Sequence, residues 1–159
     1  MRWDHQVVWR EPSPTLSVRE KVHSGHVGER LKEILPKAIK AAAEHATGYP
    51  FAIWHDVSGT IPDQIFDMEA GMQVFKGAVD ADGFKISHLP GGNILQITYV
   101  GSYDGLSDAY TEIVQWMRAN AFEPAGPPWD SYVDDAELTG VDNCRTLICW
   151  PVRSNAYNR

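Results

Sequence analysis

Gly126-Pro127-Pro128-Trp129-Asp130-Ser131-Tyr132-Val133-Asp134 repeats the pattern of Gly48-Tyr49-Pro50-Phe51-Ala52-Ile53-Trp54-His55-Asp56, and Tyr132 stands 78 residues after Trp54. Upstream, Tyr99-Val100-Gly101-Ser102-Tyr103-Asp104-Gly105 matches Val22-His23-Ser24-Gly25-His26-Val27-Gly28, since Gly105 stands 77 residues after Gly28. Two copies with so long a period do not form a solenoid, which needs several stacked units. The sequence therefore predicts a duplicated half-domain that closes on itself with approximate two-fold symmetry.

Each copy has the pattern strand, helix, strand, strand. Apolar residues spaced three and four apart predict helices over 28–46 and 106–119. Pro36 lies inside the first of these patterns and predicts a kink or a break, because proline lacks a backbone donor. Apolar runs predict a last strand in each copy, over 65–75 and 145–152, with a bulge at Ala70-Gly71 in the first.

This alternation predicts a single α+β domain over residues 1–159, built from duplicated βαββ half-domains with a mainly antiparallel sheet. We place the first half at about 15–76, a link at about 77–92 and the second half at about 93–153. A seam between two halves is a natural place for a ligand, so we expect a pocket there.

Charge and hydropathy exclude several classes of protein. The net charge is −7 and basic residues are scattered, so we expect no direct nucleic-acid binding, which depends on neutralising phosphates. A negative field favours cationic small molecules instead. No apolar run approaches 18 residues, so no membrane span is predicted, and the start of the chain lacks a signal-peptide pattern. A cytoplasmic, bacterial-type protein is the expectation.

Asp130 is the main candidate for chemistry. In a strand it shares a face with Tyr132, while Trp129 and Ser131 share the other face. One interpretation is that this face is wet, or that Asp130 pairs with an arginine such as Arg145. The other is a carboxylate at the base of an aromatic pocket, where it attracts a cation or acts as an acid or base. The repeat equivalent of Asp130 is Ala52, so one half supplies charge and the other supplies room.

Aromatic residues are the second signal, because the chain has six tryptophans and six tyrosines. Trp54 and Tyr132 occupy equivalent positions in the two halves, so a two-fold seam brings them together. Tyr103 and Trp150 are further candidates for its lining. Aromatic faces hold flat apolar rings and cations, although core packing is the alternative for each of these side chains.

Other motifs carry little chemistry. His23 and His26 have the spacing of a metal-binding pair, but no third ligand is indicated, so no metal site and no cofactor are predicted. Cys144 and Cys149 are expected to be buried apolar side chains on opposite faces of a strand.

The ordered set of short motifs resembles the GyrI-like (gyrase-inhibitor-like) superfamily of small-molecule-binding domains, which includes the effector-binding domains of bacterial transcription activators. The likeness covers roughly residues 6 to 152, and its residues are Asp67 to Val74, Leu89-Pro90-Gly91-Gly92, Thr98 to Leu106, Ala109-Tyr110, Trp116, Gly126 to Tyr132, and Ile148-Cys149-Trp150-Pro151-Val152. The resemblance implies two βαββ modules with a pocket between them.

The resemblance also implies roles. Family members bind effectors for multidrug-responsive regulators, bind small molecules on their own, or hydrolyse electrophilic cyclopropane-containing toxins. The family's strand motif has a glutamate two residues before the tyrosine. That glutamate binds the cationic group of the ligand or acts in catalysis. Asp130 stands at that position, one methylene shorter. The repeats fill this chain, so no helix-turn-helix is expected.

Three hypotheses for function follow. The first is a stand-alone protein that binds lipophilic, often cationic, aromatic compounds through Asp130, Trp54, Tyr132, Tyr103 and Trp150. The second is a hydrolase of electrophilic cyclopropane-type toxins with Asp130 as catalytic acid or base. The third is an interaction protein whose partner is gyrase or a regulator. We favour binding over catalysis.

Overall fold

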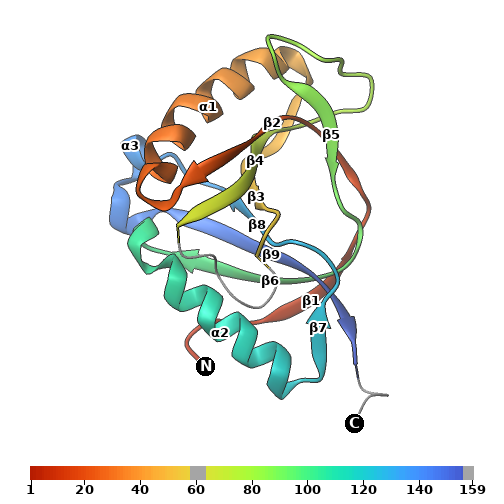
Figure 1. Cartoon of the computed structure of the whole chain (residues 1–159), viewed down its shortest axis with the longest axis vertical. Helices are drawn as coiled ribbons and strands as arrows, with labels where there is room; N and C mark the ends of the chain where they lie inside the picture. Colours follow the sequence, from red (N-terminus) through yellow and green to blue (C-terminus); the bar gives the residue numbers. More distant parts are fainter. Residues whose placement is uncertain (58–63, 156–159) are drawn as a thin grey trace.

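The computed structural model describes residues 1–57 and 64–155 (Figure 1). Its strands are β1 (Gln6–Arg10), β2 (Ser13–His23), β3 (Ala46–Trp54), β4 (Ile65–Val74), β5 (Lys85–Leu89), β6 (Gly92–Val100), β7 (Phe122–Pro124), β8 (Trp129–Tyr132) and β9 (Arg145–Ser154). Its α-helices are α1 (Val27–Ala42), α2 (Leu106–Ala119) and α3 (Ala136–Thr139). The named strands pair antiparallel throughout, which confirms the predicted α+β class.

The order of the strands shows the duplication directly. The sheet runs β1-β6-β9-β8-β3-β4-β2-β5, and β7 pairs with the end of β9. Outward from the central β8–β3 pair, β9 and β6 on one side correspond to β4 and β2 on the other. The two units are therefore β2-α1-β3-β4 and β6-α2-β8-β9, which confirms the predicted pair of βαββ half-domains.

The edge strands interlock the two halves. β1 precedes the first half in the chain but pairs with β6 of the second half. β5 precedes the second half and pairs with β2 of the first. β5 lies within the segment 77–92, for which the sequence predicted a link and no strand. Each half therefore receives its outermost strand from the chain segment that leads into the other half.

The seam lies between β3 and β8. Ala52 lies directly opposite Asp130, Phe51 opposite Ser131, and Ile53 opposite Trp129. The approximate two-fold axis passes between Ala52 and Asp130, because these repeat-equivalent residues face each other. The sequence offset had matched the same two positions.

The curled sheet separates two clusters of buried side chains. The larger cluster lies between the sheet and the helices α1 and α2, which cover the same face (Figure 1). It contains Ala52, Trp54, Tyr132 and Trp150 from the strands, together with helix residues such as Ile113. The smaller cluster consists of residues at alternating strand positions, namely Phe51, Ile53, Leu89, Ile94, Trp129 and Cys149. This alternation places Asp130 on the helix-covered face.

Several elements differ from the sequence predictions. α1 continues through Pro36 without a break. Pro36 cannot donate to the carbonyl of Lys32, but both residues lie on the exposed side of the helix, so water can bind that carbonyl instead. The helix ends at Ala42 and passes into a 3₁₀ turn, Ala43–His45, rather than reaching residue 46. The bulge predicted at Ala70-Gly71 is absent, since both residues keep their register with β2. None of the described helices combines the length and the apolar character needed to span a membrane.

Candidate functional site

Asp130 lies in the middle of the short central strand β8, and only 1% of its surface is exposed. The hydroxyl of Tyr110 on α2 donates to Asp130 Oδ1 at 2.6 Å. The indole Nε1 of Trp54, at the end of β3, donates to Oδ2 at 3.0 Å. Both carboxylate oxygens therefore accept hydrogen bonds from aromatic residues, one from each half of the molecule.

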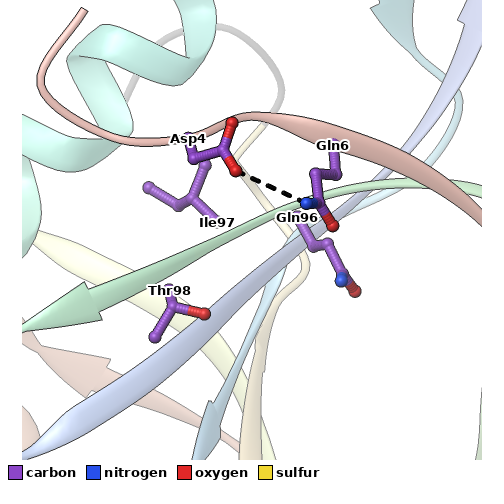
Figure 2. Close-up of a pocket in the computed structure, with 5 residues that line it drawn as sticks. All are labelled: Asp4, Gln6, Gln96, Ile97 and Thr98. Atoms are coloured by element: carbon purple, nitrogen blue, oxygen red, sulfur yellow. Dashed lines mark hydrogen bonds between the residues drawn. The ribbon is translucent and has the colours of Figure 1, made fainter.

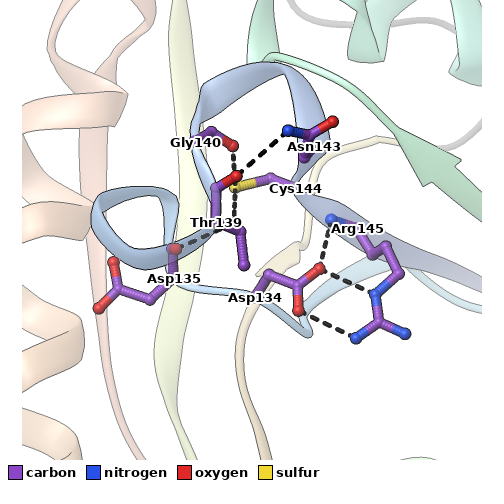
Figure 3. A network of polar contacts seen from close by, with 7 residues as sticks. All are labelled: Asp134, Asp135, Thr139, Gly140, Asn143, Cys144 and Arg145. Carbon is purple, nitrogen blue, oxygen red and sulfur yellow. Dashed lines mark hydrogen bonds and ion pairs between the residues drawn. The ribbon is translucent and has the colours of Figure 1, made fainter.

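The alternative interpretation of Asp130 is wrong on both counts. Its face of β8 is not exposed to solvent, because both Asp130 and Tyr132 are buried there. Arg145 does not reach Asp130. The residue of β9 that lies opposite Asp130 is Ile148, whereas Arg145 lies at the exposed start of β9. Arg145 instead binds Asp134, with Nε 2.8 Å from Oδ2 and an Nη atom 2.9 Å from Oδ1 (Figure 3).

Burial raises the pKa of Asp130 from its ordinary value of 3.8 to about 6, and the hydrogen bonds from Tyr110 and Trp54 oppose that rise. Among the described residues, no Lys, Arg or His nitrogen lies within ion-pair distance of this carboxylate. At neutral pH the site therefore holds a negative charge that is hydrogen-bonded but not neutralised.

A cavity of about 350 Å³ opens beside Asp130. Ser24 and Ser107 lie in its wall, and the rest of the wall besides Asp130 is apolar or aromatic: Val27, Trp54, Val57, Phe66, Tyr103, Leu106 and Tyr110. Trp54 packs edge-on against Phe66, with ring centroids 5.4 Å apart. The N-terminal parts of α1 and α2 and the seam strands β3 and β8 thus border one cavity, and Asp130 lies in its wall.

The five predicted site residues separate into two groups. Asp130, Trp54 and Tyr103 line the cavity. Tyr132 does not line it, and its ring meets that of Tyr103 at 5.8 Å in an edge-on contact. Trp150 is fully buried and donates its indole N–H to the carbonyl of Gly126 at 3.0 Å. Contact with a ligand stays a prediction for all five.

Tyr110 is the hydrogen-bonding partner of Asp130 that the sequence reasoning missed. The sequence reasoning also did not predict the other residues of the cavity wall, which are Ser24, Val27, Val57, Phe66, Leu106 and Ser107. The helical spacing placed it on the apolar face of residues 106–119, and there it is indeed buried. A tyrosine hydroxyl on a buried face needs a hydrogen-bond partner. That need is the signal from which a hydrogen bond between Tyr110 and Asp130 could have been predicted, because Asp130 is the carboxylate predicted in the strand that follows this helix.

One other hollow offers weaker chemistry. A second hollow, of about 240 Å³, lies over β1 and β6 and is lined by Asp4, Gln6, Gln96, Ile97 and Thr98 (Figure 2). It has no aromatic wall, and Gln6 already donates to Asp4 at 3.4 Å. Over residues 1–57 and 64–155, no group of three or more His, Cys, Asp or Glu side chains is arranged to hold a metal ion.

The fold and the cavity define a class of protein: a duplicated βαββ domain with a small-molecule pocket at its seam. The chain belongs to the family of the GyrI-like small molecule binding domain, whose model matches residues 4–153. No curated protein sequence matches it.

Solved structures show the same fold. The C-terminal domain of EcmrR is 21% identical, with a TM-score of 0.83, over 97% of this chain and 99% of that one. SAV2435, solved bound to tetraphenylphosphonium, is 14% identical, with a TM-score of 0.65, over 94% of each chain. A hydrolase from Listeria innocua is 14% identical, with a TM-score of 0.62, over 94% of this chain and 91% of that one.

Proposed function

We propose that this protein binds lipophilic aromatic cations in the seam cavity, as a multidrug-type pocket, with Asp130 providing charge complementarity. The observation that carries the proposal is the pairing state of Asp130. Its carboxylate is buried and ionises near neutral pH, yet its partners are the uncharged donors Trp54 and Tyr110. A buried charge without a counter-ion is costly, so a cation that enters the cavity relieves that cost.

The wall of the cavity supports the same class of ligand. Aromatic faces attract cations through their quadrupole, and the aromatic residues Trp54, Phe66 and Tyr103 line the cavity. A lipophilic cation with a delocalised or shielded charge loses little hydration on entry, so the attraction to Asp130 is retained as affinity. A structural relative, SAV2435, was solved with tetraphenylphosphonium, which is a cation of this kind.

The proposal predicts that Asp130→Asn weakens binding of tetraphenylphosphonium about ten-fold to a hundred-fold, since one charge–charge interaction at short range and intermediate dielectric is removed. Binding of neutral triphenylphosphine oxide should be nearly unchanged. Titration calorimetry, or quenching of tryptophan fluorescence, at pH 8 measures both compounds.

Asp142→Asn is the matched control, because it changes net charge equally at an exposed residue outside the cavity wall. Equal losses for the cation and the neutral compound in Asp130→Asn would contradict the proposal. So would equal losses of cation binding in the two variants.

A hydrolase of electrophilic ring compounds is the second candidate. The pKa of Asp130, at about 6, suits a group that exchanges protons near neutral pH, and Tyr110 places a hydroxyl beside it. One structural relative is described as a hydrolase. In an enzyme of this type Asp130→Asn abolishes turnover while a cyclopropane-containing substrate still binds, which product analysis in the same mixtures detects.

A further inference from the structure

The surroundings of Asp130 contain few groups that could control its charge. Among residues 1–57 and 64–155, the titratable side chains that interact with it are Tyr110 from α2, Tyr103 from the 3₁₀ turn Tyr103–Gly105, Tyr132 from β8 and Cys149 from β9. From β3, its partner is the non-titrating indole of Trp54.

All four titratable neighbours are uncharged at neutral pH. Burial raises the pKa of Cys149 to about 12, and burial likewise raises the pKa values of Tyr103, Tyr110 and Tyr132 above their ordinary value. Asp130 is therefore the charged member of this group. Its ionisation is set by a balance between burial, which favours the protonated form, and two hydrogen bonds, which favour the carboxylate.

We infer that Trp54 and Tyr110 are positioning residues that keep Asp130 ionised at neutral pH and thereby set the pH below which the pocket stops preferring cations. The preference for cations rests on the proposed function. The control of ionisation does not, because it follows from the two contacts of 3.0 Å and 2.6 Å in the free protein.

The two donors bind different oxygens of the Asp130 carboxylate. Trp54 binds Oδ2 and Tyr110 binds Oδ1, so each oxygen keeps lone-pair capacity for a ligand while the carboxylate cannot rotate freely. Trp54 comes from the first half of the chain, whereas Asp130 and Tyr110 come from the second. The charge state of the pocket therefore depends on contact across the seam.

The first experiment measures Asp130 itself. Its side-chain carboxyl carbon is followed by NMR from pH 4 to pH 9 in protein labelled with ¹³C-aspartate, with Asp130→Asn to assign the signal. The wild-type midpoint is expected near pH 6. Tyr110→Phe, which deletes one hydroxyl, should raise the midpoint by about one pH unit, and Trp54→Phe should raise it similarly.

Tyr99→Phe is the matched control. Tyr99 is also a buried tyrosine on the helix-covered face, but its hydroxyl donates to the carbonyl of Ser102 at 2.6 Å. Its loss should leave the Asp130 midpoint unchanged. A midpoint that stays near pH 6 in both Tyr110→Phe and Trp54→Phe, or that rises equally in Tyr99→Phe, overturns the inference whether or not a ligand binds.

The second experiment measures tetraphenylphosphonium affinity over the same pH range. Tyr110→Phe should bind the cation roughly five-fold to ten-fold more weakly than wild type at pH 6, and should regain wild-type affinity near pH 9, where both carboxylates are ionised. Recovery at high pH distinguishes lost charge from a damaged pocket. Midpoints that shift without any change in cation affinity would uphold the control of ionisation and overturn the proposed function.

Discussion

Asp130 has opposite effects on the free protein and on its proposed complex. Burial at 1% exposure disfavours its ionised form, and the hydrogen bonds from Trp54 and Tyr110 offset only part of that effect. The free protein therefore carries a destabilising charge at neutral pH. Binding sites often reduce the stability of the fold that holds them, because the groups they display lack partners until the ligand arrives.

The cost of this charge can be measured as stability. The pKa of Asp130 is higher in the folded protein than in the unfolded chain, so its contribution to stability is fully present below pH 3.8 and is lost as pH rises through about 6. Asp130→Asn removes the loss. At pH 8 the variant should be about 3 kcal/mol more stable to urea than wild type, and most of that difference should disappear toward pH 4. The expected sign would be refuted if the stability of Asp130→Asn relative to wild type were lower at pH 8 than at pH 4.

At the residue level, strand alternation was enough to predict that Asp130 shares a face with Tyr132, and the repeat offset was enough to align it with Ala52. The same patterns could not predict the partners of Asp130. Periodicity gives the face on which a side chain lies, but not which helix covers that face or which hydroxyl reaches the carboxylate. Tyr110 therefore looked like core, and Arg145 like a partner.

At the level of elements, segments that belong to the repeat were predictable even when short, such as β8, and short edge strands outside the repeat were not. The predicted bounds of α2, residues 106–119, match the structure. β5 and β7 were missed, because five and three residues at a sheet edge carry too little alternation to be recognised. Their pairing is decided by tertiary contact with β2 and β9.

Gly71 illustrates an element-level requirement that has a measurable consequence. A Cβ at this residue would collide with the carbonyl of Leu16 and lie 2.7 Å from Ser17 Cα, both on the neighbouring strand β2. The glycine is therefore explained by close approach of two strands rather than by a bulge. Gly71→Ala should lower the free energy of unfolding by roughly 2–4 kcal/mol.

Gly28→Ala is the comparison for that measurement. A Cβ at Gly28 meets nothing within 4 Å, and the residue lies in the first turn of α1. Because alanine restricts the unfolded chain and favours the helix, this variant should gain about 0.5 kcal/mol. If the two substitutions changed stability similarly in urea denaturation, the close contact with β2 would not be the reason that residue 71 is a glycine.

At the level of the whole molecule, the exchanged edge strands make the halves mutually dependent. A protease site inserted between Asp82 and Gly83 would cut the chain in the turn before β5. The first fragment would keep β1 on β6 of the second, and the second would keep β5 on β2 of the first. The cut protein should therefore elute as one species on size exclusion and retain tetraphenylphosphonium binding. Separate fragments in native buffer would refute this interlocking.

The pairing of Ala52 with Asp130 has a consequence for how such a site can arise. If two identical chains met at this axis, they would present the same residue twice, and two aspartates facing each other across antiparallel strands would have Cβ atoms about 5 Å apart. Their repulsion would push one of them to hold a proton. A single chain that carries both copies escapes this constraint, because each copy can mutate alone. Fusion thus permits a lone negative charge on a symmetric scaffold, and a cation bound as proposed would have one preferred orientation instead of two equivalent ones.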